Sequence, residues 1–295
     1  MFTQFVLQVV YANCFTKAVY TNFHNSSIKI LVFILIFILI TIMTLEEIRD
    51  KYRLTADYHT HTRYSVVGPY RHGKGTIMEN VEAAHAAGLK EIAITDHGPK
   101  EFYGLDPKKI PQMRAEIAEA QARFPDVKIL LGVEANIMDS PNGLDVATEH
   151  IADYDFVNAG YHYGVPRCHM IANWISFNLP CPQALKDRVC KTNTELALRA
   201  LHSNNIKILT HPGDKAHFDM DALGAACAET GTLVEINARH KRPNVEDIKT
   251  LAKYAVDFII SSDAHTPDKV GRYVKSVALA EAAGVLDRIV NLTTR

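Results

Sequence analysis

The segment ADYHTH, residues 56 to 61, decides the fold. It is a short strand-like run that carries two histidines, His59 and His61, at its end. Because side chains alternate between the two faces of a strand, both imidazoles point to the same face. Such a strand offers two nitrogen ligands to one metal ion or to two adjacent ions.

The same kind of segment recurs along the chain. Short β-branched runs alternate with helical patterns, which is typical of repeated βα units around a parallel sheet. An open doubly wound sheet would also fit this alternation, but a closed barrel would bring the ends of all its strands to one face. Besides 56 to 61, the predicted strands are EIAITDH (91 to 97), KILLGVEANI (128 to 137), DFVNAGYHY (155 to 163), IKILTHP (206 to 212), TLVEINAR (232 to 239) and DFIISSDAH (257 to 265).

Two of the predicted helices carry clear end signals. TIMENVEAAHAAG has Gly88 just past its end, and in DPKKIPQMRAEIAEAQARF Asp106 can cap the helix with Pro107 in its first turn. Residues 165 to 183 are expected to form a long loop.

The composition of the chain indicates one globular domain. Of 295 residues, 47% are hydrophobic and 22% charged, so we expect residues 46–295 to form a single domain. The formal net charge is -1 and long basic runs are absent, which argues against nucleic acid as a partner. The five cysteines form no CxxC pair, so neither a disulfide framework nor a thiolate zinc site is expected, and a reducing cytoplasm fits.

The first 45 residues differ from the rest. Ile30 to Leu45 is an uncharged apolar run, slightly short for a membrane-spanning helix. Met43 is followed by a sequence that resembles a natural cytosolic start. We interpret residues 1–45 as a hydrophobic extension from a mis-assigned start, with a membrane anchor as the alternative.

Polar residues that bind metal ions end six of the seven predicted strands. In a barrel these ends converge, and imidazole with carboxylate suits zinc, manganese or iron. A carboxylate such as Glu134 could bridge two ions. The chain has 14 histidines, and seven of them, on predicted helices or loops, are interpreted as structural: His24, His85, His150, His169, His202, His217 and His240. The eight predicted ligands are His59, His61, His97, Glu134, His162, His211, Asp263 and His265.

From Ala56 onward the chain resembles the PHP (polymerase and histidinol phosphatase) family, in particular its YcdX-like stand-alone phosphatases. The matching stretches are DYHTHTRYS, ITDHGP, GVEANI, AGYH, THPGD, EIN and SSDAHT, in family order. The resemblance implies a distorted seven-stranded (β/α)7 TIM-like barrel with a trinuclear metal site. Its implied ligand sets are His59, His61, Glu134 and Asp263 for one ion, Glu134, His162 and His211 for a second, and His72, His97 and His265 for a third.

His72 departs from the family pattern. Residues 66 to 71 separate it from the HTH serine, so the insertion could displace it and leave a dinuclear site. We therefore expect two to three divalent ions, zinc first and manganese or iron as alternatives. The oligomeric state stays open.

The charge of such a centre points to phosphate chemistry. Three dications bring about +6 and two carboxylates about -2, so an anion should bind, and water between the ions should be acidified. We predict hydrolysis of a small phosphate monoester, with Glu134, Asp263 and His265 as the catalytic residues. Asp57 and Asp96 are candidates for orienting the imidazoles. The candidates for binding the substrate's remote end are Arg239, Lys241 and Arg242.

Other functions fit the sequence less well. Phosphodiester or exonuclease cleavage would call for a basic groove with aromatic side chains. An amidohydrolase would use a bridging lysine, where this chain has Glu134. A non-catalytic domain would be expected to lack several ligands, and all eight are present.

Overall fold

The computed structural model describes residues 45–295. The chain divides into two units, of which the first ends at Lys51 and the second is Tyr52–Arg295. The described residues of the first unit, 45 to 51, are helical. The apolar run Ile30 to Leu45, apart from its last residue, lies outside the described residues. Within residues 45–295, no helix has the length and apolar character needed to span a membrane.

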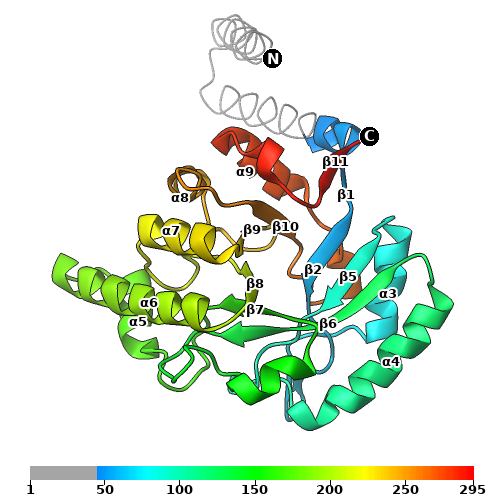
Figure 1. The fold of residues 1–295 in the computed structure, drawn as a ribbon, viewed down its shortest axis with the longest axis horizontal. Helices are drawn as coiled ribbons and strands as arrows, with labels where there is room; N and C mark the ends of the chain where they lie inside the picture. The colour runs from blue at the N-terminus through cyan, green and yellow to red at the C-terminus, as the bar shows by residue number, and fades with distance from the viewer. Residues whose placement is uncertain (1–44) are drawn as a thin grey trace, which may run out of the picture. The chain divides into compact units, whose positions relative to one another are not determined.

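The second unit is built on a parallel seven-stranded sheet, as predicted, and every predicted strand is confirmed (Figure 1). The order across the sheet is β10-β9-β8-β7-β6-β5-β2. The sheet curls until its edges meet, since the backbone N–H of His61 donates to the carbonyl of Ala264 at 2.8 Å. The strands are β2 (Ala56–Thr60), β5 (Glu91–Ile94), β6 (Lys128–Asn136), β7 (Phe156–Gly160), β8 (Ile206–Leu209), β9 (Leu233–Asn237) and β10 (Phe258–Ser261).

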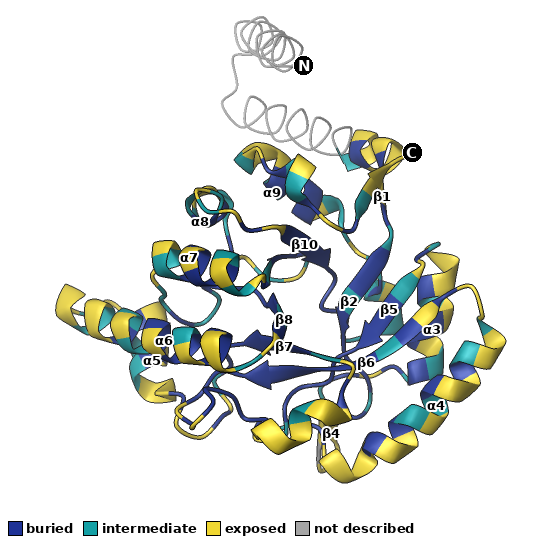
Figure 2. Ribbon diagram, in the orientation of Figure 1, coloured by how far each residue is buried: buried dark blue, intermediate teal, exposed yellow. Residues whose placement is uncertain are grey.

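Helices cover the outside of this nearly closed barrel. Figure 2 shows the buried strands inside and helices whose outer faces are exposed. The strands are buried on both faces, as is usual for parallel sheets with helical crossovers. The helices are α3 (Ile77–Ala86), α4 (Ile110–Arg123), α5 (Met170–Asn178), α6 (Gln183–Ser203), α7 (Met220–Thr230), α8 (Val245–Leu251) and α9 (Val274–Ala283), with short 3-10 turns η1 (Pro107–Lys109), η2 (Thr148–Asp153), η3 (Pro267–Lys269) and η4 (Leu286–Arg288).

Local sequence explains where several helices begin. Thr76 and Glu79 form a capping box at α3, in which each side chain accepts a hydrogen bond from the other's backbone N–H. Asp106 caps η1, which runs into α4. Helix α7 starts at the cap Asp219 and ends at Gly231, whose φ of 70° is readily adopted by glycine. These signals hold the helices that return the chain to the barrel.

Three features differ from the predictions. Residues 165 to 183 are not one long loop, because Met170–Asn178 forms α5. The insertion before His72 contains a hairpin of β3 (Val66–Val67) and β4 (Tyr70–Arg71). The chain's last strand, β11 (Leu292–Thr294), pairs antiparallel with β1 (Tyr52–Leu54). Both strand pairs are only two or three residues long, which is too short for a sequence period to reveal.

Candidate metal centre

The eight predicted ligands meet at one end of the barrel. Each lies near the carboxyl end of a strand or just after it, and parallel strands bring these ends together at one end of the barrel. All but His265 are buried, and His265 is mostly buried. The structure therefore places together side chains that the sequence spreads over more than two hundred residues, from His59 to His265.

Glu134 lies at the middle of this group, and its two carboxylate oxygens face different histidines. Its Oε2 lies 3.2 Å from His59 Nε2 and 3.0 Å from His97 Nδ1. Its Oε1 lies 3.0 Å from His211 Nε2 and 3.6 Å from His162 Nε2. A carboxylate placed in this way can bridge two cations.

Around Oε2, four ligand atoms have the spacing of a metal site. His59 Nε2 and His61 Nε2 are 3.1 Å apart, and Asp263 Oδ1 lies 3.2 Å from His61 Nε2 and 3.8 Å from His59 Nε2. Glu134 Oε2 is 3.5 Å from His61 Nε2. Ligands bound about 2.05 Å from one tetrahedral ion lie about 3.3 Å apart. The observed separations between these four atoms, 3.1 to 3.8 Å, lie around that value.

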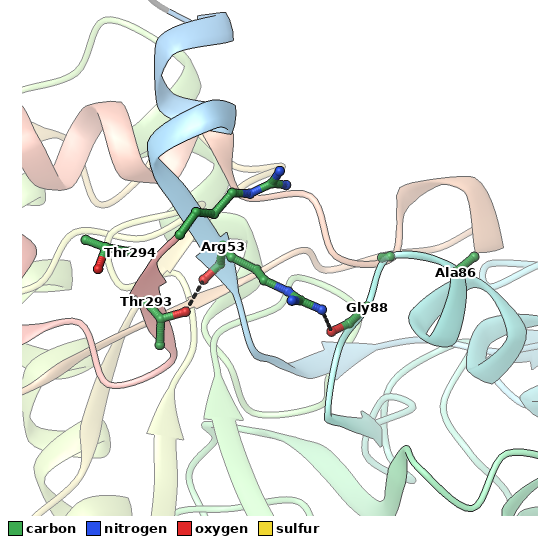
Figure 3. Close-up of a pocket in the computed structure, with 7 residues that line it drawn as sticks. Arg53, Ala86, Gly88, Thr293 and Thr294 are labelled. Atoms are coloured by element: carbon green, nitrogen blue, oxygen red, sulfur yellow. Dashed lines mark hydrogen bonds between the residues drawn. The ribbon is translucent and has the colours of Figure 1, made fainter.

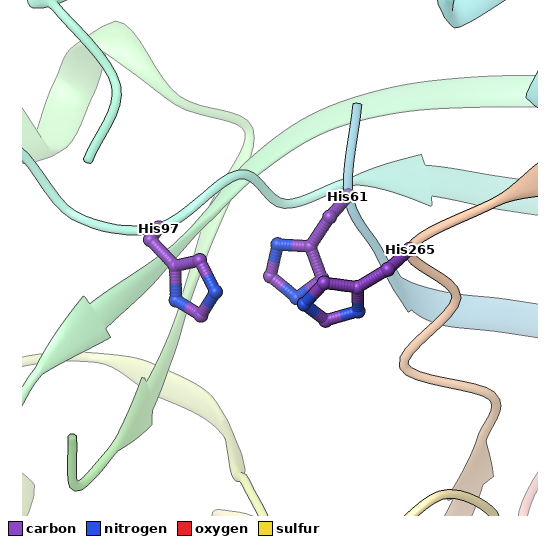
Figure 4. Close-up of side chains that lie close together, drawn as sticks. All are labelled: His61, His97 and His265. Atoms are coloured by element: carbon purple, nitrogen blue, oxygen red, sulfur yellow. The ribbon is translucent and has the colours of Figure 1, made fainter. Parts of the chain in front are cut away.

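A second cluster contains His61, His97 and His265, whose candidate ligand atoms lie within 4.8 Å of one another (Figure 4). The resemblance to the PHP family implies His72, rather than His61, as the partner of His97 and His265. The His72 ring lies beside this cluster, 4.4 Å from His265 and 5.2 Å from His97 between ring centroids. The insertion has therefore not removed His72 from the centre, although in the structure His61 completes the cluster.

His240 belongs to the centre, contrary to its structural interpretation from sequence. Its Nε2 lies 2.9 Å from Asp263 Oδ2, and its Nδ1 lies 3.0 Å from Asp214 Oδ2. With His211 and Asp263 it forms another group of converging ligand atoms. It follows β9 by three residues, and that strand ends in Asn237 rather than in a histidine, so the strand-end pattern did not include it.

Two further residues orient the imidazoles. Glu235, which the sequence analysis missed, is fully buried and lies 2.8 Å from His59 Nδ1, and it also accepts the backbone N–H of His211 at 2.8 Å. Asn136 Oδ1 lies 2.6 Å from His162 Nδ1. Such partners leave the other ring nitrogen free to bind a metal ion. Glu235 lies in the EIN stretch, whose alternation with Asn237 was the available signal.

The two aspartates predicted for that role bind elsewhere. Asp57 accepts hydrogen bonds from the backbone N–H groups of Ser262 and Gly271. Asp96 accepts from the Thr62 and Ser65 hydroxyls, both at 2.6 Å. Both aspartates therefore hold loops of the rim in place, and the hypothesis that they orient imidazoles is wrong.

Burial and neighbouring charge set the protonation of the centre. Burial lowers the pKa of His59, but the charges of Glu134, Glu235 and Asp263 outweigh burial and raise that pKa well above its usual range. Burial and the nearby imidazoles hold the pKa of His61 well below its usual range. Burial alone would raise the pKa of Glu134, yet the surrounding histidines hold it well below its usual range. The carboxylate is therefore ionised and ready to bind a cation.

The backbone is strained at two of the candidate ligands. His211 has a φ of 30° and Asp263 a φ of 51°, in the left-handed region that non-glycine residues rarely adopt. Each such residue costs about 1–3 kcal/mol and persists where the surroundings fix it. Both residues come two positions after the end of a strand, β8 for His211 and β10 for Asp263, where the chain leaves the barrel.

The donor set fits divalent cations. His97 Nε2 and His265 Nε2 are buried and have no hydrogen-bond partner among residues 45–295, and Glu134 Oε2 lies near two imidazole nitrogens without forming a hydrogen bond to either. Leaving such atoms unpaired would cost free energy, and cations would satisfy them. Imidazole and carboxylate without thiolate is a donor set for zinc, manganese or iron.

The three candidate basic residues lie at different distances from the centre. Arg239 is 45% exposed and its Nη1 lies 3.4 Å from Asp263 Oδ2. Arg242 instead forms an ion pair with Asp247, in the first turn of α8. Lys241 is exposed. Arg239 is thus the one of these three whose guanidinium contacts a candidate ligand.

A cavity of about 470 Å³ lies near the paired β1 and β11 (Figure 3). Arg53 crosses it and donates to the Gly88 carbonyl at 2.8 Å. Gly88 precedes β5, so this cavity is at the opposite end of the barrel from the candidate ligands. It is lined by Arg53, Ala86, Ala87, Gly88, Thr293, Thr294 and Arg295, which include no candidate metal ligand.

Comparison with known proteins identifies the class to which this barrel and its histidine centre belong. The PHP domain model matches residues 57–265, and the chain therefore belongs to the PHP domain family. A probable phosphatase of Thermoanaerobacter sp. (strain X514) is 28% identical over 253 residues, covering 81% of this chain and 90% of that protein. A probable phosphatase of Caldanaerobacter subterraneus is 29% identical over 257 residues, covering 82% and 88%.

A solved structure has the same fold. The histidinol phosphate phosphatase of Lactococcus lactis, complexed with zinc, L-histidinol and phosphate, aligns with a TM-score of 0.53. The alignment covers 78% of this chain and 92% of that one, at 16% sequence identity. This likeness confirms the PHP-type barrel.

Proposed function

We propose that this PHP-family phosphatase hydrolyses a small phosphate monoester at a centre of two or three divalent ions. The class follows from the family and from relatives that are probable phosphatases. The number of ions, their identity as zinc, and the ester are our proposals. The bound zinc and phosphate of the Lactococcus protein support zinc and a phosphate ligand.

One observation carries this proposal: the two oxygens of Glu134 face two separate groups of imidazoles. We assign His59, His61, Asp263 and Glu134 to one ion, and Glu134, His162 and His211 to a second. His97 and His265 would hold a third, with His61 or His72. The ions would supply Lewis-acid stabilisation of the phosphate and an acidified water.

The protein's own side chains position the reaction. Thr210 donates its hydroxyl to Glu134 Oε1 at 2.9 Å, and Glu235 fixes the His59 ring, so the centre is held before substrate arrives. Arg239 lies at the rim with its guanidinium beside Asp263, where it can hold a phosphate oxygen. Lys241 and Arg242 remain weaker candidates for the substrate's remote end, because Arg242 is paired with Asp247.

The test uses the full chain, stripped with EDTA and reloaded separately with zinc, manganese and ferrous iron. Phosphate release is measured from p-nitrophenyl phosphate and from bis(p-nitrophenyl) phosphate, which differ in being a monoester and a diester. We expect the monoester to be cleaved at least ~10-fold faster per kcat/KM, because a diester carries one charge fewer toward the cations. A preference for the diester would overturn the monoester proposal, and no cleavage with any metal would overturn the hydrolytic one.

A matched pair of variants tests Arg239. Arg239→Gln should raise KM for the monoester about tenfold, because one charge-assisted hydrogen bond to phosphate is lost. Lys241→Gln, an exposed neighbour, is the control and should change KM little. Equal effects of the two changes would remove Arg239 from the phosphate site.

A further inference from the structure

A large apolar pocket of about 920 Å³ opens beside the metal centre. Its wall comes mainly from two segments, the turn after β5 that carries Phe102 and the chain from Tyr163 into α5, with Lys215 added from the loop after β8. Phe102 and Ile171 are each 70% exposed, so this apolar surface faces water in the free protein. The apolar side chains of its lining include Phe102, Tyr103, Val165, Cys168, Met170 and Ile171.

The pocket adjoins the centre through residues of its wall. Tyr103, in the pocket wall, stacks on the His72 ring at 3.9 Å between centroids and meets the His97 ring edge-on at 5.0 Å. Tyr163 directly follows His162. Lys215, also in the wall, lies 3.7 Å from Asp214, which in turn contacts His240. A molecule whose phosphate lay at the centre could therefore extend into this pocket.

One polar side chain in the wall has an unused acceptor. Glu101 is only 4% exposed, and its Oε2 has no hydrogen-bond partner among the described residues. Its Oε1 accepts the backbone N–H of Phe102 at 3.3 Å and packs directly on Gly164. A Cβ at residue 164 would overlap that oxygen, so only glycine leaves room for the carboxyl group.

Burial raises the pKa of Glu101 to about 7. A buried acceptor without a partner is destabilising, and a ligand that donates a hydrogen bond would relieve the cost. Glu101 is not one of the candidate metal ligands and lies in a wall that is mostly apolar, so the pocket has two parts. Most of it is suited to an apolar body, and one point is suited to a donor.

We propose that this pocket binds the alcohol part of the phosphate monoester, and that the alcohol has an apolar or aromatic body with a hydrogen-bond donor directed at Glu101. The proposal rests on the proposed function and adds the class of its substrate. Phosphate at the ions and the alcohol in the pocket would then share one substrate. The donor is a hydroxyl or an ammonium group, which the test separates.

The experiment compares four phosphate monoesters on the metal-loaded full chain. The aryl phosphates of tyrosol, tyramine and 4-ethylphenol share one body and carry a hydroxyl, an ammonium and no donor, and glycerol phosphate lacks the apolar body. We expect kcat/KM to be about tenfold higher for an ester with the donor that Glu101 accepts than for 4-ethylphenyl phosphate, the size of one hydrogen bond to a charged group. Glycerol phosphate should be the poorest.

Variants at Glu101 identify the donor. Glu101→Met removes both acceptors at similar volume, so it should abolish the preference for either donor. Because it also removes the hydrogen bond from the Phe102 N–H, each donor ester is compared with 4-ethylphenyl phosphate in the same variant. Glu101→Gln keeps one acceptor, so it should abolish a preference for ammonium and largely retain one for hydroxyl. Four esters cleaved with similar kcat/KM, or a Glu101→Met variant with the wild-type order, would overturn the inference.

A substitution at an exposed residue of the pocket tests whether a loss of activity comes from the pocket or from misfolding. Ile171→Ser should lower kcat/KM for the aryl esters severalfold and leave kcat/KM for glycerol phosphate unchanged. Val290→Ser, at an exposed aliphatic residue near β11, should change neither value.

Binding of free tyramine and tyrosol, followed by NMR on the EDTA-treated chain, tests the pocket without catalysis. Binding lost in Glu101→Met supports the pocket even where no ester is cleaved, a result that would refute only the proposed function. No binding together with uniform cleavage would refute only the pocket.

Discussion

Replacing Glu134 with Gln should disable the centre while keeping its shape. In the structure one carboxylate oxygen lies 3.0 Å from His211 Nε2 and the other 3.0 Å from His97 Nδ1 and 3.2 Å from His59 Nε2. The amide has the same outline but carries no charge, and one of its two ends is a donor. At least one group of imidazoles would then face an N–H group in place of an oxygen ligand.

The size of the effect follows from what the carboxylate does. Glu134 is the strongest of the charges that raise the pKa of His59 against the lowering effect of burial, so it contributes a large part of the negative potential at this point. Without it, two dications would lie close together with less screening, and one should bind much more weakly. We expect turnover to fall at least ~100-fold, which corresponds to roughly 2.7 kcal/mol of transition-state stabilisation.

The measurement pairs metal content by mass spectrometry with kcat on p-nitrophenyl phosphate. Glu195→Gln is the matched control, because Glu195 is an exposed glutamate of α6 with only a 4.0 Å contact to Lys191. It should keep full metal content and turnover. Near wild-type turnover with full metal content in Glu134→Gln would show that strand β6 does not supply the bridge, and the mechanism built on it would fail.

Four further results are expected. Purified protein should hold about two to three equivalents of transition metal, and elemental analysis showing less than one after supplementation would contradict the centre. Metal should be released as pH falls, because protons return to His59, whose pKa lies above its usual range, and a pH-independent dialysis profile would exclude this competition. His72→Ala should remove about one equivalent and weaken inhibition by inorganic phosphate; unchanged metal content would indicate a dinuclear enzyme. A chain starting at Met43 should be as active as the full chain, whereas recovery of the native protein from membranes with Ile30 to Leu45 intact would favour an anchor.

Much of the fold and of the centre could be predicted because both follow from the spacing of residues within single strands and helices. A strand such as ADYHTH shows its face through the spacing of two, and parallel strands share one polar end, so the eight candidate ligands could be grouped from the sequence alone. The same reasoning predicted all seven strands. This prediction needed only the sequence of each strand and the rule that the carboxyl ends of parallel strands converge.

The missed residues depend on contacts between distant loops. His240 lies three residues past β9, and only the closed barrel brings it to Asp214 and Asp263. Glu235 lies within β9, where alternation puts it on the same face as Asn237, but the sequence alone does not show that this face points inward. Asp57 and Asp96 were misjudged for a related reason. Proximity in sequence to a ligand does not fix the direction of a side chain, and both turn to backbone or hydroxyl donors.

The residues that sequence reasoning missed also change the charge of the centre, and with it the role of a third ion. Glu235 joins Glu134 and Asp263, while Asp214 pairs with His240, so the net negative charge of the protein here is about -3 and not -2. Two dications would leave an excess of about +1, less than the charge of a phosphate dianion, and three would leave about +3, which exceeds it. Arg239 adds one positive charge at the rim. With Arg239 counted, the excess would be about +2 for two ions and about +4 for three, so a dinuclear form should bind phosphate more weakly than a trinuclear one. His72, beside the His61, His97 and His265 cluster, thus bears on the affinity for phosphate through the ion that it helps to hold, even though it need not touch the substrate.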